Sequence, residues 1–403
     1  MHAKLDRSSR ARRVPAAALA VIAIALAACG PGVQLPGVHE PLDSDEWRRC
    51  AGELADREEM SLIDDLTLDS KTLLCQGVVL AADGELERAL ELLTEAGVRD
   101  PEDHRPHYLR GRILAENGRY EEALTAFERS QDRFPEMQVP TERLGRKVRE
   151  KDGDAPARRF LQLARERELC PYGCLGLLAE LHHDAGEDDR AERVYERMVE
   201  LDPAEPAAYV GLARLANAAG DHMAESELLT EATRAGHFSS LSEARQADIH
   251  YAHAFSRYNV RKLKGAAASI ERALALRDDR ADWHVLAGWI QLALGDPVAA
   301  LTEFDRAIEM DPGLAAARAG RGDALVETGA ADEAVGAYER ARERDPADAV
   351  IVLKLAYAVA VEGDIERAAD LVDEAAALDA EHLPPDLLGK VTELVEAAKG
   401  DGE

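Results

Sequence analysis

Small, aromatic and helix-breaking residues recur along this chain at intervals of 34 residues. The register is clearest in the C-terminal half, where the pairs are Gly288 and Gly322, Gly295 and Gly329, Ala300 and Ala334, Phe304 and Tyr338, Ala307 and Ala341, and Pro312 and Pro346. A repeat of this length indicates an array of similar supersecondary units rather than one globule around a central active site. Such a chain is expected to offer a binding surface.

Each period predicts two helices joined by a tight turn. The first helix is expected to end at a glycine, which adopts the left-handed conformation without strain from a Cβ atom. The second is expected to end before a proline, which cannot continue the helical hydrogen bonds. These residues are Gly84, Gly118, Gly186, Gly220, Gly295, Gly329 and Gly363, and Pro101, Pro135, Pro203, Pro312 and Pro346. With 4% aromatic and 46% hydrophobic residues, the composition disfavours sheets, so the predicted fold is all-α.

Small residues also recur inside both helices, where the backbones must approach closely. They are Gly77, Gly111, Gly145, Ala179, Ala213, Ala254, Gly288, Gly322 and Ala356 in the first helices, and Ala89, Ala123, Ala157, Ala191, Ala266, Ala300, Ala334 and Ala368 in the second. This spacing, with its glycine turn and closing Asp-Pro, resembles the tetratricopeptide repeat (TPR). The resemblance implies a right-handed superhelix, an α-solenoid, of about nine helix-turn-helix units. The units fit residues 70–103, 104–137, 138–171, 172–205, 206–239, 247–280, 281–314, 315–348 and 349–382.

Some segments depart from the repeat pattern. Residues 240–246 interrupt the phase and separate units 70–239 from units 247–382, which predicts a longer bend or shift in the superhelix, or a tolerated loop insertion. Apolar residues at helical spacing predict capping helices within 44–69 and 383–399, which would cover the apolar faces of the terminal repeats. Arg261 replaces the glycine of one turn.

The first 43 residues read as a targeting segment and a tether. Basic residues precede the apolar run Val14–Ala28, and the sequence Leu26-Ala27-Ala28-Cys29 follows. A basic start and a short apolar stretch are typical of a signal peptide, here residues 1–28. The ending resembles the lipobox of bacterial lipoproteins, which implies lipidation of Cys29. The alternative is an ordinary signal peptide with an incidental cysteine. The proline- and glycine-rich residues 29–43 predict a tether. Gly30 after the cysteine favours an outer-membrane location facing the periplasm.

The net charge of −29 disfavours nucleic-acid partners, because phosphate backbones would repel so acidic a body. The sequence contains no phosphate-binding loop, nucleophile elbow, zinc-protease motif or dinucleotide fingerprint. It therefore predicts no enzyme, no cofactor and no metal site. The histidine pairs His182-His183 and His250/His253 lack the carboxylates or thiols that would complete a metal shell, and His253 stands where the repeat normally buries leucine.

Cysteine spacing predicts two candidate disulfides. With Cys29 lipidated, four cysteines remain, an even number in an exported chain. Cys170 and Cys174 lie at the join of two repeats, and a bridge between them would fix the entry to one helix. Cys50 and Cys75 could join the N-terminal capping helix to the first repeat. The alternative for each cysteine is a small buried thiol.

The TPR resemblance implies a groove lined by the first helices of the repeats. The side chains expected to point into it are Tyr108, Arg112, Arg146 and Arg149 in the second and third repeats, and Tyr251, Phe255, Tyr258 and Trp289 in the sixth and seventh. The arginines could receive a carboxylate, and the aromatic side chains could anchor an apolar partner. The alternative is a mixed surface with no single site.

Together these features predict a membrane-anchored TPR scaffold or adaptor that mediates protein–protein interaction in the bacterial cell envelope. Its expected role is in assembly of a secretion, pilus, motility or outer-membrane complex. The alternative is an adaptor that recruits enzymes of cell-wall or envelope-protein turnover. In either case the partners are proteins or peptides, with a membrane contact through the lipid.

Overall fold

The computed structural model describes residues 70–400 of the chain. Over this range the chain forms nineteen α-helices and no strand, as the predicted all-α class requires. The signal peptide, Cys29, the tether, the N-terminal capping helix and Cys50 lie outside the described residues. Among the described helices, none combines the length and apolar character needed to cross a membrane.

The chain divides into two compact units between Val194 and Tyr195, inside helix α10. Unit 1 here means residues 70–194 and unit 2 residues 195–400. The helices of unit 1 are α3 (Ser70–Ala82), α4 (Leu86–Arg99), α5 (Arg105–Glu116), α6 (Tyr120–Arg133), α7 (Thr141–Asp152), α8 (Asp154–Glu166), α9 (Tyr172–Asp184) and the start of α10 (Asp188–Leu201). Each odd-numbered helix is the first of a repeat and each even-numbered helix the second.

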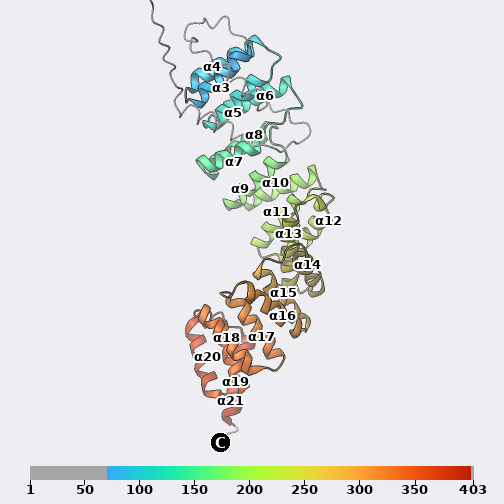
Figure 1. Ribbon diagram of the computed structural model, residues 1–403, viewed down its shortest axis with the longest axis vertical. Coiled ribbons are helices and arrows are strands. Elements are labelled where there is room, and N and C mark those ends of the chain that lie inside the picture. Colours follow the sequence, from blue (N-terminus) through green and yellow to red (C-terminus); the bar gives the residue numbers. More distant parts are fainter. Residues whose placement is uncertain (1–69, 401–403) are drawn as a thin grey trace, which may run out of the picture. The chain divides into compact units, whose positions relative to one another are not determined.

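The helices of unit 2 continue the same alternation. They are the end of α10, then α11 (Pro206–Ala218), α12 (His222–Arg234), α13 (Glu243–Asn259), α14 (Leu263–Leu276), α15 (Ala281–Leu294), α16 (Pro297–Met310), α17 (Ala315–Glu327), α18 (Ala331–Arg344), α19 (Ala349–Glu362), α20 (Ile365–Asp379) and α21 (Pro385–Gly400). Figure 1 shows successive helices of unit 2 arranged as antiparallel pairs. Within residues 70–382, the nine predicted repeats correspond to nine such pairs.

Aromatic side chains of second helices wedge against glycines of first helices. The ring of Phe304 on α16 lies against Gly288 of α15 and Gly320 of α17, where an added Cβ atom would come within 2.7 and 2.3 Å of it. Phe304 is fully buried. The recurring small residues therefore let one aromatic ring fill the space between two first helices, at the close packing typical of protein interiors.

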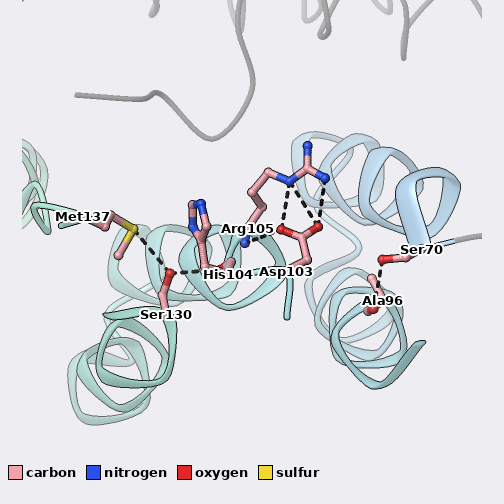
Figure 2. A network of polar contacts seen from close by, with 7 residues as sticks. All are labelled: Ser70, Ala96, Asp103, His104, Arg105, Ser130 and Met137. Carbon is pink, nitrogen blue, oxygen red and sulfur yellow. Dashed lines mark hydrogen bonds and ion pairs between the residues drawn. The ribbon is translucent and has the colours of Figure 1, made fainter. Parts of the chain in front are cut away.

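Buried hydroxyl groups join the two ends of a repeat at places where the pattern usually has alanine or another apolar residue. Ser130 of α6 donates a hydrogen bond of 2.9 Å to the carbonyl of His104, at the start of the same repeat (Figure 2). Thr141 donates at 2.9 Å to the carbonyl of Leu169, before α9. Both side chains are fully buried, and these bonds satisfy hydroxyl groups that would be costly to bury alone.

Left-handed residues close most first helices as predicted. Gly295 ends α15 with φ +83° and ψ +23°, a conformation in which glycine avoids Cβ strain. Between α13 and α14 the residue in this place is Arg261, which adopts φ +58°. The turn therefore keeps its geometry without the glycine.

The insertion, residues 240–246, begins at the last residue of a short 3₁₀ turn, Phe238–Ser240, and ends inside α13. Helix α13 is 17 residues long, against 14 for α15. Ser242 caps it by accepting a hydrogen bond of 3.4 Å from the backbone nitrogen of Arg245. Residues 243–246 of the insertion thus belong to the first helix of the sixth repeat.

Helix α21 lies where the C-terminal cap was predicted. Val391 and Val395 are buried, and the helix packs against α19 and α20. Its exposed side includes Leu394. An amphipathic helix in this place covers apolar side chains that a terminal repeat would otherwise expose.

Candidate partner-binding surface

In unit 1 the predicted groove residue Tyr108 is part of the core, so that prediction was wrong. Its side chain is 6% exposed and meets Phe127 edge-on, with ring centroids 5.9 Å apart. Phe127 also presses against Gly111, one turn further along α5. Because Gly111 has no side chain, the Phe127 ring of α6 can lie directly against α5, and Tyr108 packs against that ring.

The three predicted arginines of unit 1 are held by carboxylates of the same chain. Arg112 lies 3.9 Å from Glu116, and Arg146 lies 3.0 Å from Glu142. Arg149 contacts both Asp154 at 2.7 Å and Asp184 at 2.9 Å, and the hydrogen bond that Arg149 donates to Asp154 raises the pKa of its guanidinium. These arginines are on the surface, but their charges are already matched. A partner's carboxylate would have to compete with these ion pairs.

In unit 2 the predicted aromatic residues differ in how far they are exposed. Tyr251 stacks on Trp283 with ring centroids 5.2 Å apart, and it packs into the core between α13 and α15. Burial raises the pKa of its hydroxyl group. Phe255, one turn along α13, is 38% exposed and meets His222 edge-on. Tyr251 is therefore part of the core beneath this surface, whereas the ring of Phe255 is exposed to solvent.

Tyr258 and Trp289 lie between these extremes. Both are half-buried, Tyr258 against the core of α13 and α14 and Trp289 against the core that includes Phe304. Helices α13 and α15 are in contact, and Phe255 and Trp289 occupy the same repeat position, 34 residues apart. The structure thus brings the two predicted anchors onto neighbouring first helices.

The same repeat position continues to Asp323 on α17 and Tyr357 on α19, residues that our sequence analysis did not single out. The 34-residue spacing from Phe255 and Trp289 would have been sufficient to find them. Tyr357 is half-buried. We call Phe255, Trp289, Tyr357 and the adjoining Tyr258 the aromatic row.

Asp323 is the centre of a polar network within this row. It accepts hydrogen bonds of 2.7 Å from the hydroxyl group of Tyr338 and from Nζ of Lys354. Burial, reinforced by the charge of Asp323, raises the pKa of Tyr338. The network links α17, α18 and α19 and neutralises the charges of Asp323 and Lys354 on the face that carries the aromatic row.

Cys170 and Cys174 form a disulfide, with Cα atoms 5.2 Å apart. Cys174 is fully buried in the first turn of α9, and the loop before it is anchored by the hydrogen bond from Thr141 to Leu169. Cys75 is also disulfide-bonded. Pairing of Cys75 with Cys50 remains a prediction.

The predicted histidine pairs are built into the fold. His253 is 2% exposed, with Nε2 3.0 Å from the hydroxyl group of Thr230, and burial lowers its pKa to about 3. His182 and His183 contact Glu187 and Asp188 at 2.6 and 2.7 Å. No group of three or more potential metal ligands gathers anywhere in residues 70–400.

Comparison with known proteins agrees with this arrangement. Residues 76–137, 251–315 and 316–382 match one tetratricopeptide repeat family, and residues 174–235 match a second. A search of curated proteins finds no matching relative.

Among solved structures, MamA is 21% identical over 42% of this chain and 95% of its own, with a TM-score of 0.38. YrrB, a TPR protein with an unusual peptide-binding site, is 20% identical over 51% and 97%, with a TM-score of 0.39. The C-terminal part of a TPR repeat-containing protein from Cytophaga hutchinsonii is 14% identical over 62% and 98%, with a TM-score of 0.47. The family matches span most of the chain and coincide with the helix pairs, and the chain therefore belongs to the tetratricopeptide repeat family.

Proposed function

We propose that this chain is a scaffold that binds other proteins through the aromatic row of unit 2. Proteins of the TPR family generally mediate protein–protein interaction. The observation that carries the proposal is the exposure of Phe255 on a first helix, beside the half-buried Tyr258 and Trp289. Aromatic side chains that can enter a partner's pocket contribute a large share of binding energy.

The partner that fits this surface is a segment with apolar side chains spaced to meet successive first helices. Phe255 and Trp289 supply ring surfaces, whereas Asp323 and Lys354 neutralise each other. A strongly charged segment would gain little binding energy here, because the charges of Asp323 and Lys354 already pair with each other. We therefore expect apolar contacts to dominate, with hydrogen bonds at Asp323 and Lys354.

The test is capture of partners by crosslinking in the envelope, comparing the full chain with Phe255→Ala. We expect this change to weaken partner binding by about tenfold, in the range of an interface aromatic residue. The matched control is Val298→Ala, which removes another exposed apolar side chain, 68% exposed, from the second helix α16. Partners that stay bound to a folded variant lacking the Phe255, Tyr258 and Trp289 rings would refute the aromatic row as the binding site.

We further propose that the scaffold is anchored in the bacterial cell envelope by lipid on Cys29, at the outer membrane facing the periplasm. Its work would be assembly of a secretion, pilus, motility or outer-membrane complex. The support is the sequence Leu26-Ala27-Ala28-Cys29 after a short apolar run. Acyl chains contribute about 0.8 kcal/mol of membrane affinity for each buried methylene group.

Radiolabelled palmitate and globomycin test the anchor. We expect label on the wild-type chain, accumulation of the precursor with globomycin, and neither effect in Cys29→Ser. A mature protein that begins at another residue and takes no label would rule out the lipid anchor while leaving the aromatic row to its own test.

A further inference from the structure

The turn between α13 and α14 is basic, whereas the corresponding turns of the other repeats carry acidic residues. In the four residues that begin at the repeat position of Arg261, each of the other eight turns has at least one aspartate or glutamate. The sixth repeat has Arg261, Lys262 and Lys264 there instead, and no acidic residue occurs from residue 249 to residue 270. In a chain with a net charge of −29, this turn is a local exception to the acidic surface.

Two exposed apolar side chains adjoin these cations. Phe255 is 38% exposed and Met223 is 46% exposed. The ring of His222 meets Phe255 edge-on, with centroids 6.1 Å apart, and the next residue, Met223, has its Sδ 3.3 Å from Nζ of Lys262. These contacts join the start of α12 and the end of α13 into one surface, which continues the aromatic row at Phe255. We call Met223, Phe255, Arg261, Lys262 and Lys264 the basic patch.

The charges of the basic patch are not matched within the described part of the chain. Arg261, Lys262 and Lys264 are exposed, and none of them forms an ion pair with a residue of 70–400. This differs from the arginines of unit 1, such as Arg149, which is held by two carboxylates. A carboxylate from outside would therefore meet the basic patch without competing with an internal ion pair.

A fourth cation lies beneath the turn. Arg257 of α13 is half-buried, and its Nη1 donates hydrogen bonds to the carbonyl of Gly265 at 3.4 Å and to Oγ of Ser269 at 2.9 Å. Neither acceptor is charged. Burial lowers the pKa of Arg257, and repulsion from Arg272 and Arg234 adds to this effect. The positive charge of the turn is thus not compensated from below.

The carboxylates that begin α12 are engaged within their own helix pair. Asp221 accepts a hydrogen bond of 2.9 Å from the backbone nitrogen of Ala224. Glu225 is 4% exposed and accepts a hydrogen bond of 3.0 Å from Nδ2 of Asn217, with Nδ1 of His222 also 3.0 Å away. These groups stabilise α11 and α12 and do not pair with the cations of the basic patch.

The basic residues do not stabilise the turn that carries them. Lys262 is the N-cap residue of α14 and makes no capping hydrogen bond with its side chain, whereas Asp221, Asp296 and Asp364 cap α12, α16 and α20. Lys264 lies in the first turn of α14, where a positive charge opposes the helix dipole. Residues that break a local rule in this way are expected at functional positions.

We propose that the basic patch receives an acidic stretch of the partner that binds the aromatic row, with an apolar side chain of that stretch on Phe255 and Met223. This inference rests on the proposed function and adds the chemistry of the partner at one end of the row. At the other end Asp323 and Lys354 pair with each other, so carboxylates gain binding energy only at the basic patch. The difference fixes the direction in which the partner's segment lies, because complementary charges set the register of an interface.

Fluorescence anisotropy with two labelled peptides tests the charge of the partner. In one peptide a run of glutamates precedes leucine and phenylalanine residues, and in the other glutamines replace the glutamates. We expect the full chain to bind the glutamate peptide at least about fivefold more tightly at low salt. Equal affinity for the two peptides, or no binding of the glutamate peptide, would overturn the proposal.

The double variant Lys262→Asp/Lys264→Glu gives the turn the acidic residues that the ninth repeat has at the same places. It should remove the preference for glutamate and raise the thermal midpoint, because acidic residues cap and complement the start of a helix. Loss of binding in this variant therefore cannot come from unfolding. The control Arg340→Glu/Lys390→Glu makes the same change in net charge at exposed cations of α18 and α21, and the preference should stay within about twofold of wild type. A preference that survives the first double variant would show that the turn is not the contact.

Phe255→Ala separates this proposal from the proposed function. It should weaken both peptides by the same factor and leave the preference for glutamate. If it changed neither affinity while Lys262→Asp/Lys264→Glu still removed the preference, the aromatic row would be refuted as the apolar contact and charge recognition by the turn would stand. Vesicles containing phosphatidylglycerol test a membrane instead. Vesicle binding that is lost in the double variant, without any preference between the two peptides, would assign the turn to a lipid surface and exclude an acidic partner.

Discussion

The helix pair α7–α8 of unit 1 and the pair α15–α16 of unit 2 follow one 34-residue pattern but are built from different side chains. On α7, the predicted surface residues Arg146 and Arg149 are ion-paired to Glu142, Asp154 and Asp184. On α15, the residue at the position of Arg146 is Trp289, which packs against the core. The repeat fixes where a side chain points, and the residue found there decides whether the surface is polar and self-paired or apolar and partly exposed.

The interior differs in the same way. In unit 1 the leucine Leu161 fills the space beside Gly145, and in unit 2 the ring of Phe304 fills the space between Gly288 and Gly320. In unit 1 the half-buried side chain of His107 lies near the exposed Arg129 and Arg133, whereas in unit 2 His253 is fully buried among α12, α13 and α14. These contrasts lead to predictions about the buried histidine, the packing beside the glycines and the turns.

The largest expected effect is the loss of stability of unit 2 in acid. The pKa of His253 in the folded state is about 3, below the ordinary value of about 6.5 for an unfolded chain. The unfolded state therefore binds a proton first as pH falls. The unfolding free energy is therefore at its full value above pH 6.5 and decreases as pH falls toward 3. The decrease is up to about 3 kcal/mol between pH 6.5 and 4.

Replacing His253 with leucine should remove this contribution to the acid sensitivity, because burial of the imidazole, and after it the charges of Arg257, His250 and Arg272, oppose its protonation. Urea unfolding of wild type and His253→Leu at pH 7 and pH 4.5 checks it. His237→Gln, at an exposed histidine, is the control and should leave the pH dependence unchanged. A wild-type chain as stable at pH 4.5 as at pH 7 would contradict this view of the enclosed histidine.

A second prediction compares the two ways of filling the space beside a glycine. Gly288→Ala should lower the unfolding free energy by about 2–3 kcal/mol, because the Phe304 ring is held on its other side by Gly320 and cannot move away. Gly145→Ala should cost about 1 kcal/mol, since the clash is with the end of a flexible leucine side chain. Urea denaturation of both variants measures the difference, and equal losses would show that the aromatic wedge is no more rigid than the aliphatic one.

The sequence was sufficient to predict the helix pairs, because glycine, proline and small residues fix the ends and contacts of each repeat. It placed Phe255 and Trp289 on neighbouring first helices through the same period. It failed for Tyr108, which has the right position for a groove but packs against Phe127, a contact that depends on how closely two helices approach. It also could not show that Arg149 would be neutralised by Asp184, 35 residues away, because pairings between repeats depend on side-chain conformation. Nor could the sequence show that the ring nitrogens of His107 lack a hydrogen-bond partner, whereas Nδ1 of His284 contacts Glu303.

The smallest expected effect concerns the turns that join the two helices of a pair. Arg261 adopts φ +58° where the turn after α15 has Gly295 at φ +83°, and a residue with a Cβ atom is strained there by about 1–2 kcal/mol. Arg261→Gly should therefore stabilise unit 2, by about 0.5–1 kcal/mol after the greater freedom of glycine in the unfolded chain is subtracted. The reverse change, Gly295→Arg, should destabilise it by a similar or larger amount. Thermal unfolding of the two variants is the measurement. If Arg261→Gly lowers the midpoint temperature, the arginine must make a contact that stabilises the fold by more than its backbone strain costs.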